Sequence, residues 1–281
     1  MISIGCTSWG DHHSLYRGVA ARDKLKAYSE HFPIVEVDTS FYAIPPRKNC
    51  EKWVQETPET FGFIVKAYKG MTGHERVDSY FTNEKEMFAA FAHSLEPLVA
   101  SGKLRAVLCQ FPPWFDCRRE HVEKLKRLRE WLEAFPCALE LRHQSWFYRE
   151  FRERTLDFMT KHEWIHTVCD EPQAGEGSVP AVLEATDKRR TYVRLHGRNK
   201  DGWNFTGDGE EWRKVRHLYR YSEEELREWA RSLKRLSQMS EQVDVVFNNN
   251  SGGDAADNAK QLISLLGIRY EGLAPKQLRL F

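Results

Sequence analysis

The sequence lacks the features of several common protein classes. Its six cysteines include no C-x-x-C pair, so neither a structural zinc site nor a disulfide framework is predicted. No apolar run approaches the roughly 20 residues needed to cross a bilayer. No basic segment followed by an apolar run opens the chain, so we expect no signal peptide. These absences predict a cytoplasmic protein with reduced thiols and no membrane association.

The chain also lacks an excess of charge of either sign and a common cofactor-binding motif. The chain has 42 Lys and Arg against 41 Asp and Glu, so any basic surface for a nucleic acid would have to be local. There is no G-x-G-x-x-G, so no cofactor is predicted with certainty. A divalent metal is an alternative, because Glu36, Asp38, Glu140, Asp170 and His196 are suitable ligand types. Scattered carboxylates of this kind more often pair with arginines.

What the chain does contain is a regular alternation of strand and helix patterns. Eight short apolar runs occupy residues 2–6, 34–38, 63–67, 106–109, 138–146, 165–169, 192–196 and 243–247. Helical spacing predicts helices between most of them, and Ser222 before Glu225 predicts a capping box. Long loops are expected at 170–190 and 197–221. The pattern predicts a TIM-like (β/α)8 barrel of parallel strands with outer helices over residues 1–268, and a tail at 269–281. A doubly wound open sheet has the same local signals.

The apolar runs share one feature, which is that each becomes polar where it ends. Glu140 and Arg142 lie two residues apart on one strand, so their side chains project the same way. A buried carboxylate or guanidinium is costly unless it is paired or functional. Barrel active sites lie at the carboxyl ends of the strands, so we expect these residues to converge. The predicted catalytic residues are Glu36, Glu140 and His196, and the predicted substrate-binding residues are Lys66, Gln110, Arg142, His143, Trp146, Arg194, Arg198, Asn248 and Asn249.

Several of these residues have a purely structural interpretation. Glu36 could pair with Lys66 or Arg142, and His143 could point outward into packing, since it has the opposite parity to Arg142. His74 is alone in its loop and is expected to be a surface histidine. The aromatics beside the strand ends, Trp9, Trp114, Trp146, Phe147 and Trp203, could stack a base or a sugar ring or could simply pack the rim.

Donors outnumber acids among the strand-end residues, and this balance favours a small anionic ligand. Arginine suits bidentate binding of phosphate or carboxylate. The loop at 248–253 follows the last strand and opens a helix, where barrels often hold phosphate. The same Asn and Gly cluster could be a plain turn, and Asp254 at the helix start would repel an anion.

These observations lead to a functional hypothesis with two alternatives. The leading one is a hydrolase-type enzyme acting on an anionic, phosphorylated or nucleotide- or DNA-like ligand. Glu36 and Glu140 would be its acid/base groups, His196 a second proton carrier, and Lys66, Arg142 and Arg194 an anion clamp. A sugar-phosphate isomerase or lyase is the second enzyme reading. A non-catalytic ligand-binding or adaptor barrel is the third.

The end of the chain carries a separate signal. Gln277, Leu278, Leu280 and Phe281 match four of the five positions of the pentapeptide Gln-Leu-Ser/Asp-Leu-Phe, by which bacterial repair and replication proteins bind the DNA sliding clamp. Arg279 departs at the variable position. Clamp binding would make DNA or a damaged nucleotide the favoured substrate. The alternative is that the apolar end folds back onto the bottom of the barrel.

With these motifs together, nearly the whole chain resembles the YecE-like domain-of-unknown-function family. The segments that carry the resemblance begin at Ile4 and lie at 4–9, 35–42, 63–67, 110–113, 140–146, 193–198 and 247–249. The resemblance implies a TIM-like barrel and supports the strand-end residues. Two positions depart from its pattern: Asp38 stands where the family more often has Asn, and His74 is displaced by one residue in a Thr-His turn.

Overall fold

Eight parallel strands close into a barrel in the computed structural model, which describes residues 1–74, 80–205, 211 and 215–275. The strands follow in chain order, and β1 pairs with both β2 and β8, which closes the sheet. Their bounds are β1 Ile2–Thr7, β2 Ile34–Val37, β3 Gly62–Lys66, β4 Leu104–Gln110, β5 Cys137–Glu140, β6 Trp164–Asp170, β7 Arg190–Leu195 and β8 Gln242–Phe247. The closed sheet confirms the predicted barrel and excludes the open, doubly wound alternative.

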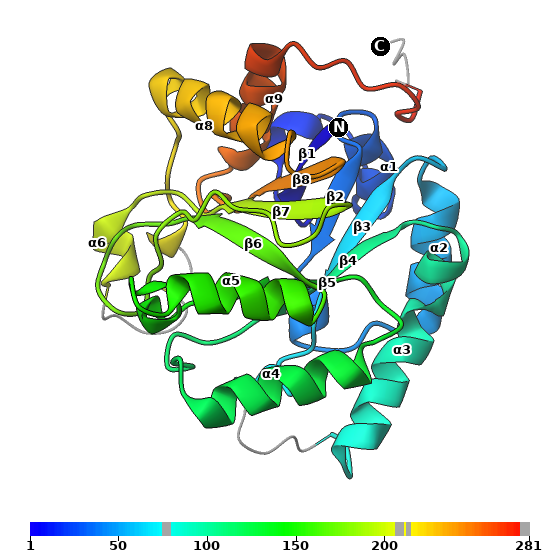
Figure 1. Cartoon of the computed structure of the whole chain (residues 1–281). Coiled ribbons are helices and arrows are strands. Elements are labelled where there is room, and N and C mark those ends of the chain that lie inside the picture. The colour runs from blue at the N-terminus through cyan, green and yellow to red at the C-terminus, as the bar shows by residue number, and fades with distance from the viewer. Residues whose placement is uncertain (75–79, 206–210, 212–214, 276–281) are drawn as a thin grey trace.

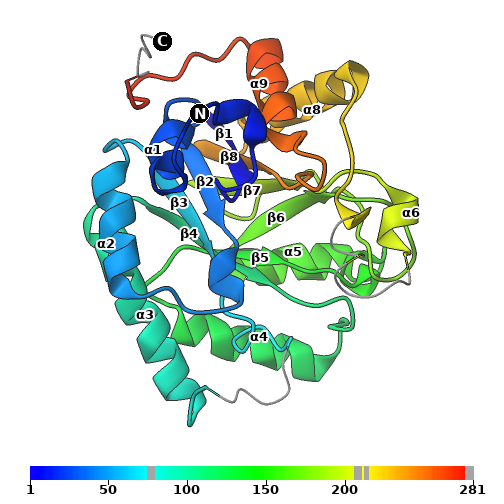
Figure 2. The same cartoon turned by 180° about the vertical axis from the view of Figure 1, so that it is seen from behind.

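The helices pack around the outside of the barrel (Figure 1, Figure 2). The α-helices are α1 Lys24–Ser29, α2 Arg47–Glu56, α3 Glu84–Ala100, α4 Arg119–Trp131, α5 Arg152–Lys161, α6 Lys200–Trp203, α8 Glu223–Leu236 and α9 Ala255–Leu266, with the short 3-10 turns η1 His13–Leu15, η2 Ala21–Asp23, η3 Thr39–Phe41 and η4 Gln144–Phe147. The predicted capping box at Ser222 and Glu225 begins α8. The strands β6 and β7 are joined without a helix, as the sequence predicts. Within the described ranges, no helix has the length and apolarity to cross a membrane.

Alternation along the strands separates two cores. One lies between the sheet and the helices, and a second, smaller cluster fills the barrel interior with Ile34, Ile64, Ala106, Leu108, Ala138, Ile165, Tyr192 and Val246. Side chains two residues apart on a strand share a face. The residues that follow this apolar layer at the same parity are Glu36, Lys66, Gln110, Glu140, Arg194 and Asn248. The interior therefore changes from apolar to ionic toward the carboxyl ends of the strands.

The segment after α9 returns to the barrel instead of leaving it. Gly267 ends the helix in the left-handed conformation, with φ of 67°. The Tyr270 hydroxyl accepts from the Ile4 amide at 2.9 Å, and the Ala274 amide donates to the Ser29 carbonyl at 3.0 Å. The first part of the predicted tail is therefore attached to the barrel. The predicted clamp-binding residues Gln277, Leu278, Leu280 and Phe281 lie outside the described residues.

Candidate active site at the carboxyl ends of the strands

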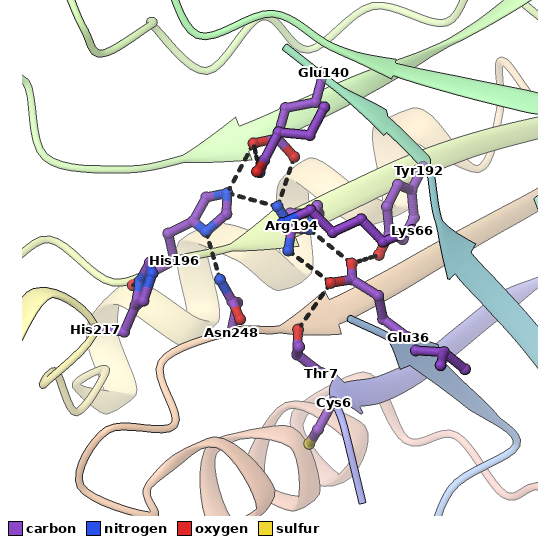
Figure 3. A network of polar contacts seen from close by, with 12 residues as sticks. Cys6, Thr7, Glu36, Lys66, Glu140, Tyr192, Arg194, His196, His217 and Asn248 are labelled. Atoms are coloured by element: carbon purple, nitrogen blue, oxygen red, sulfur yellow. Dashed lines mark hydrogen bonds and ion pairs between the residues drawn. The ribbon is translucent and has the colours of Figure 1, made fainter. Parts of the chain in front are cut away.

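Arg194 on β7 is the centre of a buried ion network (Figure 3). Its guanidinium binds Glu36 of β2 with two hydrogen bonds, from Nε to Oε2 at 2.8 Å and from Nη2 to Oε1 at 2.7 Å. Its remaining nitrogen, Nη1, donates to Oε2 of Glu140 on β5 at 2.6 Å. All three side chains are buried. One arginine thus bridges two carboxylates from distant parts of the chain.

The second oxygen of Glu140 is also occupied. Oε1 accepts from Arg142 Nε at 2.8 Å and from Gln110 Nε2 at 2.6 Å. Burial raises the pKa of Glu140, but Arg194 and Arg142 outweigh burial and hold that pKa well below its usual value. Glu140 is therefore ionised at neutral pH, with both oxygens engaged by donors.

Glu36 accepts two further hydrogen bonds besides those of Arg194. The hydroxyl of Tyr192 donates to Oε2, and Thr7 Oγ1 donates to Oε1 at 3.4 Å. Burial, and next the charge of Glu36, raise the pKa of Tyr192 well above its usual value, so the phenol keeps its proton. Figure 3 shows these donors around the Glu36 carboxylate.

His196 lies beside the bridge as a neutral ring. Its Nε2 is 3.5 Å from Arg194 Nη1 and 3.6 Å from Glu140 Oε1, and its Nδ1 is 2.9 Å from Asn248 Nδ2. Burial, then Arg194, lower its pKa to about 3. An amide nitrogen only donates, so Nδ1 accepts from Asn248 and the ring proton sits on Nε2, facing Glu140.

A cavity of about 510 Å³ opens beside this network. Its lining residues are Asp38, Phe41, Tyr42, Lys66, His74, Gln110, Pro113, Trp114, Arg142, Arg194, Arg216, His217, Asn248 and Asn250. Burial, then Arg194, lower the pKa of Lys66 to about 8, and burial, then Arg142, lower the pKa of Arg216. Burial, then Glu36, raise the pKa of Asp38. Cations therefore dominate the cavity wall, and Asp38 is its one carboxylate among the described residues.

Comparison with known proteins places the chain in a family. The family model described as "Protein of unknown function DUF72" matches residues 3–279. The chain belongs to the DUF72 family. It is 59% identical over 282 residues to the UPF0759 protein YunF of Bacillus subtilis (strain 168), covering all of both chains. It is 25% identical over 202 residues to the UPF0759 protein YecE of Escherichia coli (strain K12), covering 70% of this chain and 69% of YecE. The resemblance to the YecE-like family is confirmed.

Solved structures agree with this DUF72 membership. A crystal structure of a DUF72 family protein from Enterococcus faecalis V583 is 40% identical, has a TM-score of 0.92, and is matched over 99% of this chain and 100% of that one. A DUF72 family protein from Thermotoga maritima MSB8 is 30% identical with a TM-score of 0.81, over 95% and 100% of the two chains. A D-psicose 3-epimerase from Clostridium cellulolyticum H10, at 10% identity and a TM-score of 0.51, shares the barrel fold.

Eight of the twelve predicted site residues come together in this DUF72 barrel. They are Glu36, Lys66, Gln110, Glu140, Arg142, Arg194, His196 and Asn248. The predicted acids and His196 lie in the buried network, whereas Lys66, Arg142 and Arg194 reach the cavity. The convergence of charged side chains from different β-α units, which the sequence predicts, is present.

Two predicted binding residues lie away from the cavity on the β5 side. His143 is the N-cap residue of η4, where its Nδ1 contacts Ser145 Oγ at 2.8 Å. Trp146 is 1% exposed and donates from its indole nitrogen to the Phe115 carbonyl at 2.6 Å. His143 lies away from the cavity because its side chain has the opposite parity to that of Arg142, which lines the cavity. The Trp146 ring is part of the outer core.

The other two lie outside the cavity, on the β6 and β8 side. Arg198 pairs with Asp170 at 3.0 Å and with Glu225 at 3.0 Å. Asn249 donates to Asn258 Oδ1 at 2.9 Å and to the carbonyl of Tyr219. Both side chains therefore anchor α8 and α9 to the barrel.

Several residues of the site were not predicted from the sequence. Tyr192 has the same parity as Arg194, two residues earlier, so its strand pattern could have revealed it. His74, expected on the surface, lines the cavity instead. Arg216 and His217 also line the cavity, and they come from the irregular 197–221 segment, which carries no periodic signal. Trp203 from the same segment lies under both guanidiniums, 3.9 Å from Arg216 and 5.5 Å from Arg142.

Within the described part of this DUF72 chain, one group of residues could offer ligands to a metal, and it fits an ion network better. Glu140, Cys169 and His196 offer ligand atoms within 4.8 Å of one another. The Arg194 guanidinium already binds Glu140 and lies 3.5 Å from His196, so a cation there would face another cation. Burial, then Glu140, raise the pKa of Cys169 well above its usual value, which keeps the thiol protonated and a poor ligand.

Proposed function

We propose that this DUF72 protein is an enzyme that hydrolyses a small phosphorylated anion bound in the cavity. The observation that carries the proposal is the cationic lining. Lys66, Arg142, Arg194 and Arg216 surround a space whose described lining contains one carboxylate. Guanidinium and ammonium groups in a partly desolvated pocket bind phosphate oxygens strongly.

Two of these cations are available to a ligand. Arg142 uses Nε for Glu140, which leaves its two terminal nitrogens for an anion. The Lys66 ammonium lies over the ring of Phe41 at 4.2 Å and makes no ion pair within the described part of the chain. Arg194, by contrast, uses all three of its nitrogens for Glu36 and Glu140. A dianionic phosphate between Lys66 and Arg142 would supply the missing counter-charge.

Hydrogen-bond donors already occupy both oxygens of Glu36 and of Glu140. We therefore infer a different general base from the two acids predicted from the sequence. Asp38 lines the cavity and has a raised pKa, as a general base requires. Asp38 would accept a proton from the attacking water, and the oxygen of that water would form the new bond to phosphorus. The Lys66 ammonium, with its pKa of about 8, would protonate the leaving oxygen as the old bond breaks. Glu36, Glu140 and His196 would then position the arginines.

The test is turnover of a generic phosphomonoester and phosphodiester, p-nitrophenyl phosphate and bis-p-nitrophenyl phosphate. Asp38→Asn should lower kcat by about 100-fold or more while phosphate affinity, measured by calorimetry, is kept. Asp157→Asn, on the exposed face of α5, is the matched control and should keep wild-type turnover. Phosphate binding with no turnover of either ester would favour the non-catalytic barrel, and isomerisation of ribose 5-phosphate without phosphate release would favour the isomerase. Failure to bind phosphate would overturn the proposal.

A further inference from the structure

Four rings form a continuous row along one wall of the cavity. Tyr42 and Phe41 have centroids 5.2 Å apart, Phe41 and His74 4.8 Å, and His74 and Trp114 6.1 Å. Each pair meets edge to face, at 89°, 89° and 70°. All four side chains line the cavity. This ring row (Tyr42, Phe41, His74, Trp114) comes from the loops after β2, β3 and β4.

The ends of the ring row are uncovered. Trp114 is 63% exposed and Tyr42 is 53% exposed. By comparison, two tryptophans that pack in the core are covered, since Trp146 is 1% exposed and Trp164 is fully buried. A large apolar face held at the mouth of a cavity is a surface for stacking a flat ligand ring.

The ring row lies beside the cations. The Lys66 ammonium lies over the Phe41 ring at 4.2 Å, which joins the aromatic wall to the charged floor. His74 is neutral, because burial, then Lys66, lower its pKa to about 3, so the row adds no charge of its own. The cavity thus offers two adjoining surfaces, one for an anionic group and one for a ring.

We propose that the ligand is a nucleoside phosphate, with its phosphate at Lys66 and Arg142 and its base stacked on Trp114. This inference rests on the proposed function and names its substrate class. A cavity of about 510 Å³ is of the size that holds such a ligand, since small-molecule sites span about 300–1,000 Å³. A sugar phosphate would use the cations but would leave the exposed indole without a partner. A free nucleotide and the 5′-phosphorylated end of a single-stranded nucleic acid both offer this combination of a phosphate and a base.

Calorimetry with three probes separates the phosphate site from the base site. The probes are inorganic phosphate, ribose 5-phosphate and adenosine 5′-monophosphate. The nucleotide should bind about 10-fold or more tightly than ribose 5-phosphate, because base stacking on an aromatic ring adds affinity. Trp114→Ala should remove that difference. Trp131→Ala, which removes a 44% exposed indole of α4 outside the cavity, should keep it.

The outcomes separate this inference from the proposed function. Equal affinity for the nucleotide and ribose 5-phosphate, with phosphate still bound, would overturn the nucleoside assignment and leave the phosphate site standing. Failure of all three probes to bind would overturn both. A 5′-phosphorylated single-stranded oligonucleotide that binds more tightly than the nucleotide would identify a chain end as the ligand, and weaker binding would identify the free nucleotide; either result supports a nucleoside phosphate.

Discussion

At the scale of single residues, Arg194 determines the charge state of the site. Its guanidinium pairs with both Glu36 and Glu140 inside the barrel, where either carboxylate alone would be costly. Because Arg194 and Arg142 outweigh burial and hold the pKa of Glu140 well below its usual value, that carboxylate stays ionised and keeps both arginines fixed beside the cavity. In the proposed function, the two acids predicted as catalytic, Glu36 and Glu140, would therefore hold the arginines in place beside the bound anion.

Arg194→Met should leave two buried carboxylates without their shared counter-ion. We expect the free energy of unfolding at neutral pH to fall by about 3–5 kcal/mol, measured by urea denaturation. Arg227→Met breaks an exposed ion pair with Glu223 on α8 and should change it by less than about 1 kcal/mol. Equal losses in the two variants would refute the central role of Arg194.

Lys66 should make anion binding pH-dependent. Its pKa of about 8 means that the ammonium is lost as pH rises through that value, so the affinity for sulfate, whose own charge is constant, should fall there. The free energy of unfolding, by contrast, should rise over the same pH range. The unfolded chain holds the proton up to its ordinary pKa of 10.5, so this residue adds stability as pH rises from about 8. Calorimetry at pH 7 and 9 measures the affinity, and Lys66→Met should flatten the profile; a slope unchanged in that variant would contradict the assignment.

At the scale of elements, α8 shows how a helix supports the site without entering it. Its residue Trp229 donates to Asp170 at the end of β6 at 3.0 Å, and its capping box fixes where the helix begins. Ser222→Ala should lower the free energy of unfolding by about 1 kcal/mol and leave anion affinity unchanged. Ser232→Ala on the exposed face of the same helix is the control, and thermal unfolding measures both. No difference between the two variants would mean that the cap adds no stability.

The regular elements could be predicted from the sequence because periodicity reports which face is buried. The alternation that ends in Glu140 and Arg142 also placed both side chains correctly toward the barrel mouth. Arg216 and His217 could not be found in this way, because they reach the cavity from an irregular segment whose path depends on tertiary contacts such as the hydrogen bonds from the Asn199 side chain to the Val215 and Leu218 carbonyls. Arg198 and Asn249 follow strand ends, but their side chains bind residues of α8 and α9. Sequence spacing does not show whether such a side chain contacts the cavity or a neighbouring helix.

At the scale of the whole molecule, buried neutral histidines should make the fold sensitive to acid. Burial is the main cause that lowers the pKa of His74 and His196 to about 3 and of His166 to about 4. The unfolded chain takes up these protons near the ordinary value of 6.5, so the free energy of unfolding should fall as pH drops below it, by about 1.4 kcal/mol per pH unit for each group. Glu171 opposes this trend between its raised pKa of about 7 and its usual 4.5, because it binds its proton earlier in the folded state.

Urea denaturation at pH 7, 6 and 5 measures the net slope. His166→Asn, outside the cavity, should make that slope shallower, whereas His93→Asn, on the exposed side of α3, should not. A slope that is the same in all three proteins would show that His166 is not held neutral by the fold.

The end of the chain carries the remaining prediction. Gln277, Leu278, Leu280 and Phe281 should bind the bacterial sliding clamp, and a pull-down with and without residues 277–281 tests it. Loss of the clamp on truncation is the expected result, and equal recovery would end the hypothesis.

The most direct measurement of the central claim is a crystal structure of the protein soaked with tungstate, a heavy oxyanion that resembles phosphate. We expect an anomalous peak in the cavity, within hydrogen-bond distance of Lys66 and Arg142 and beside the Arg194 bridge. Peaks confined to other cationic surfaces, such as the hollow lined by Arg105, Arg129 and Arg190 at the opposite end of the barrel, with none in the cavity, would contradict it.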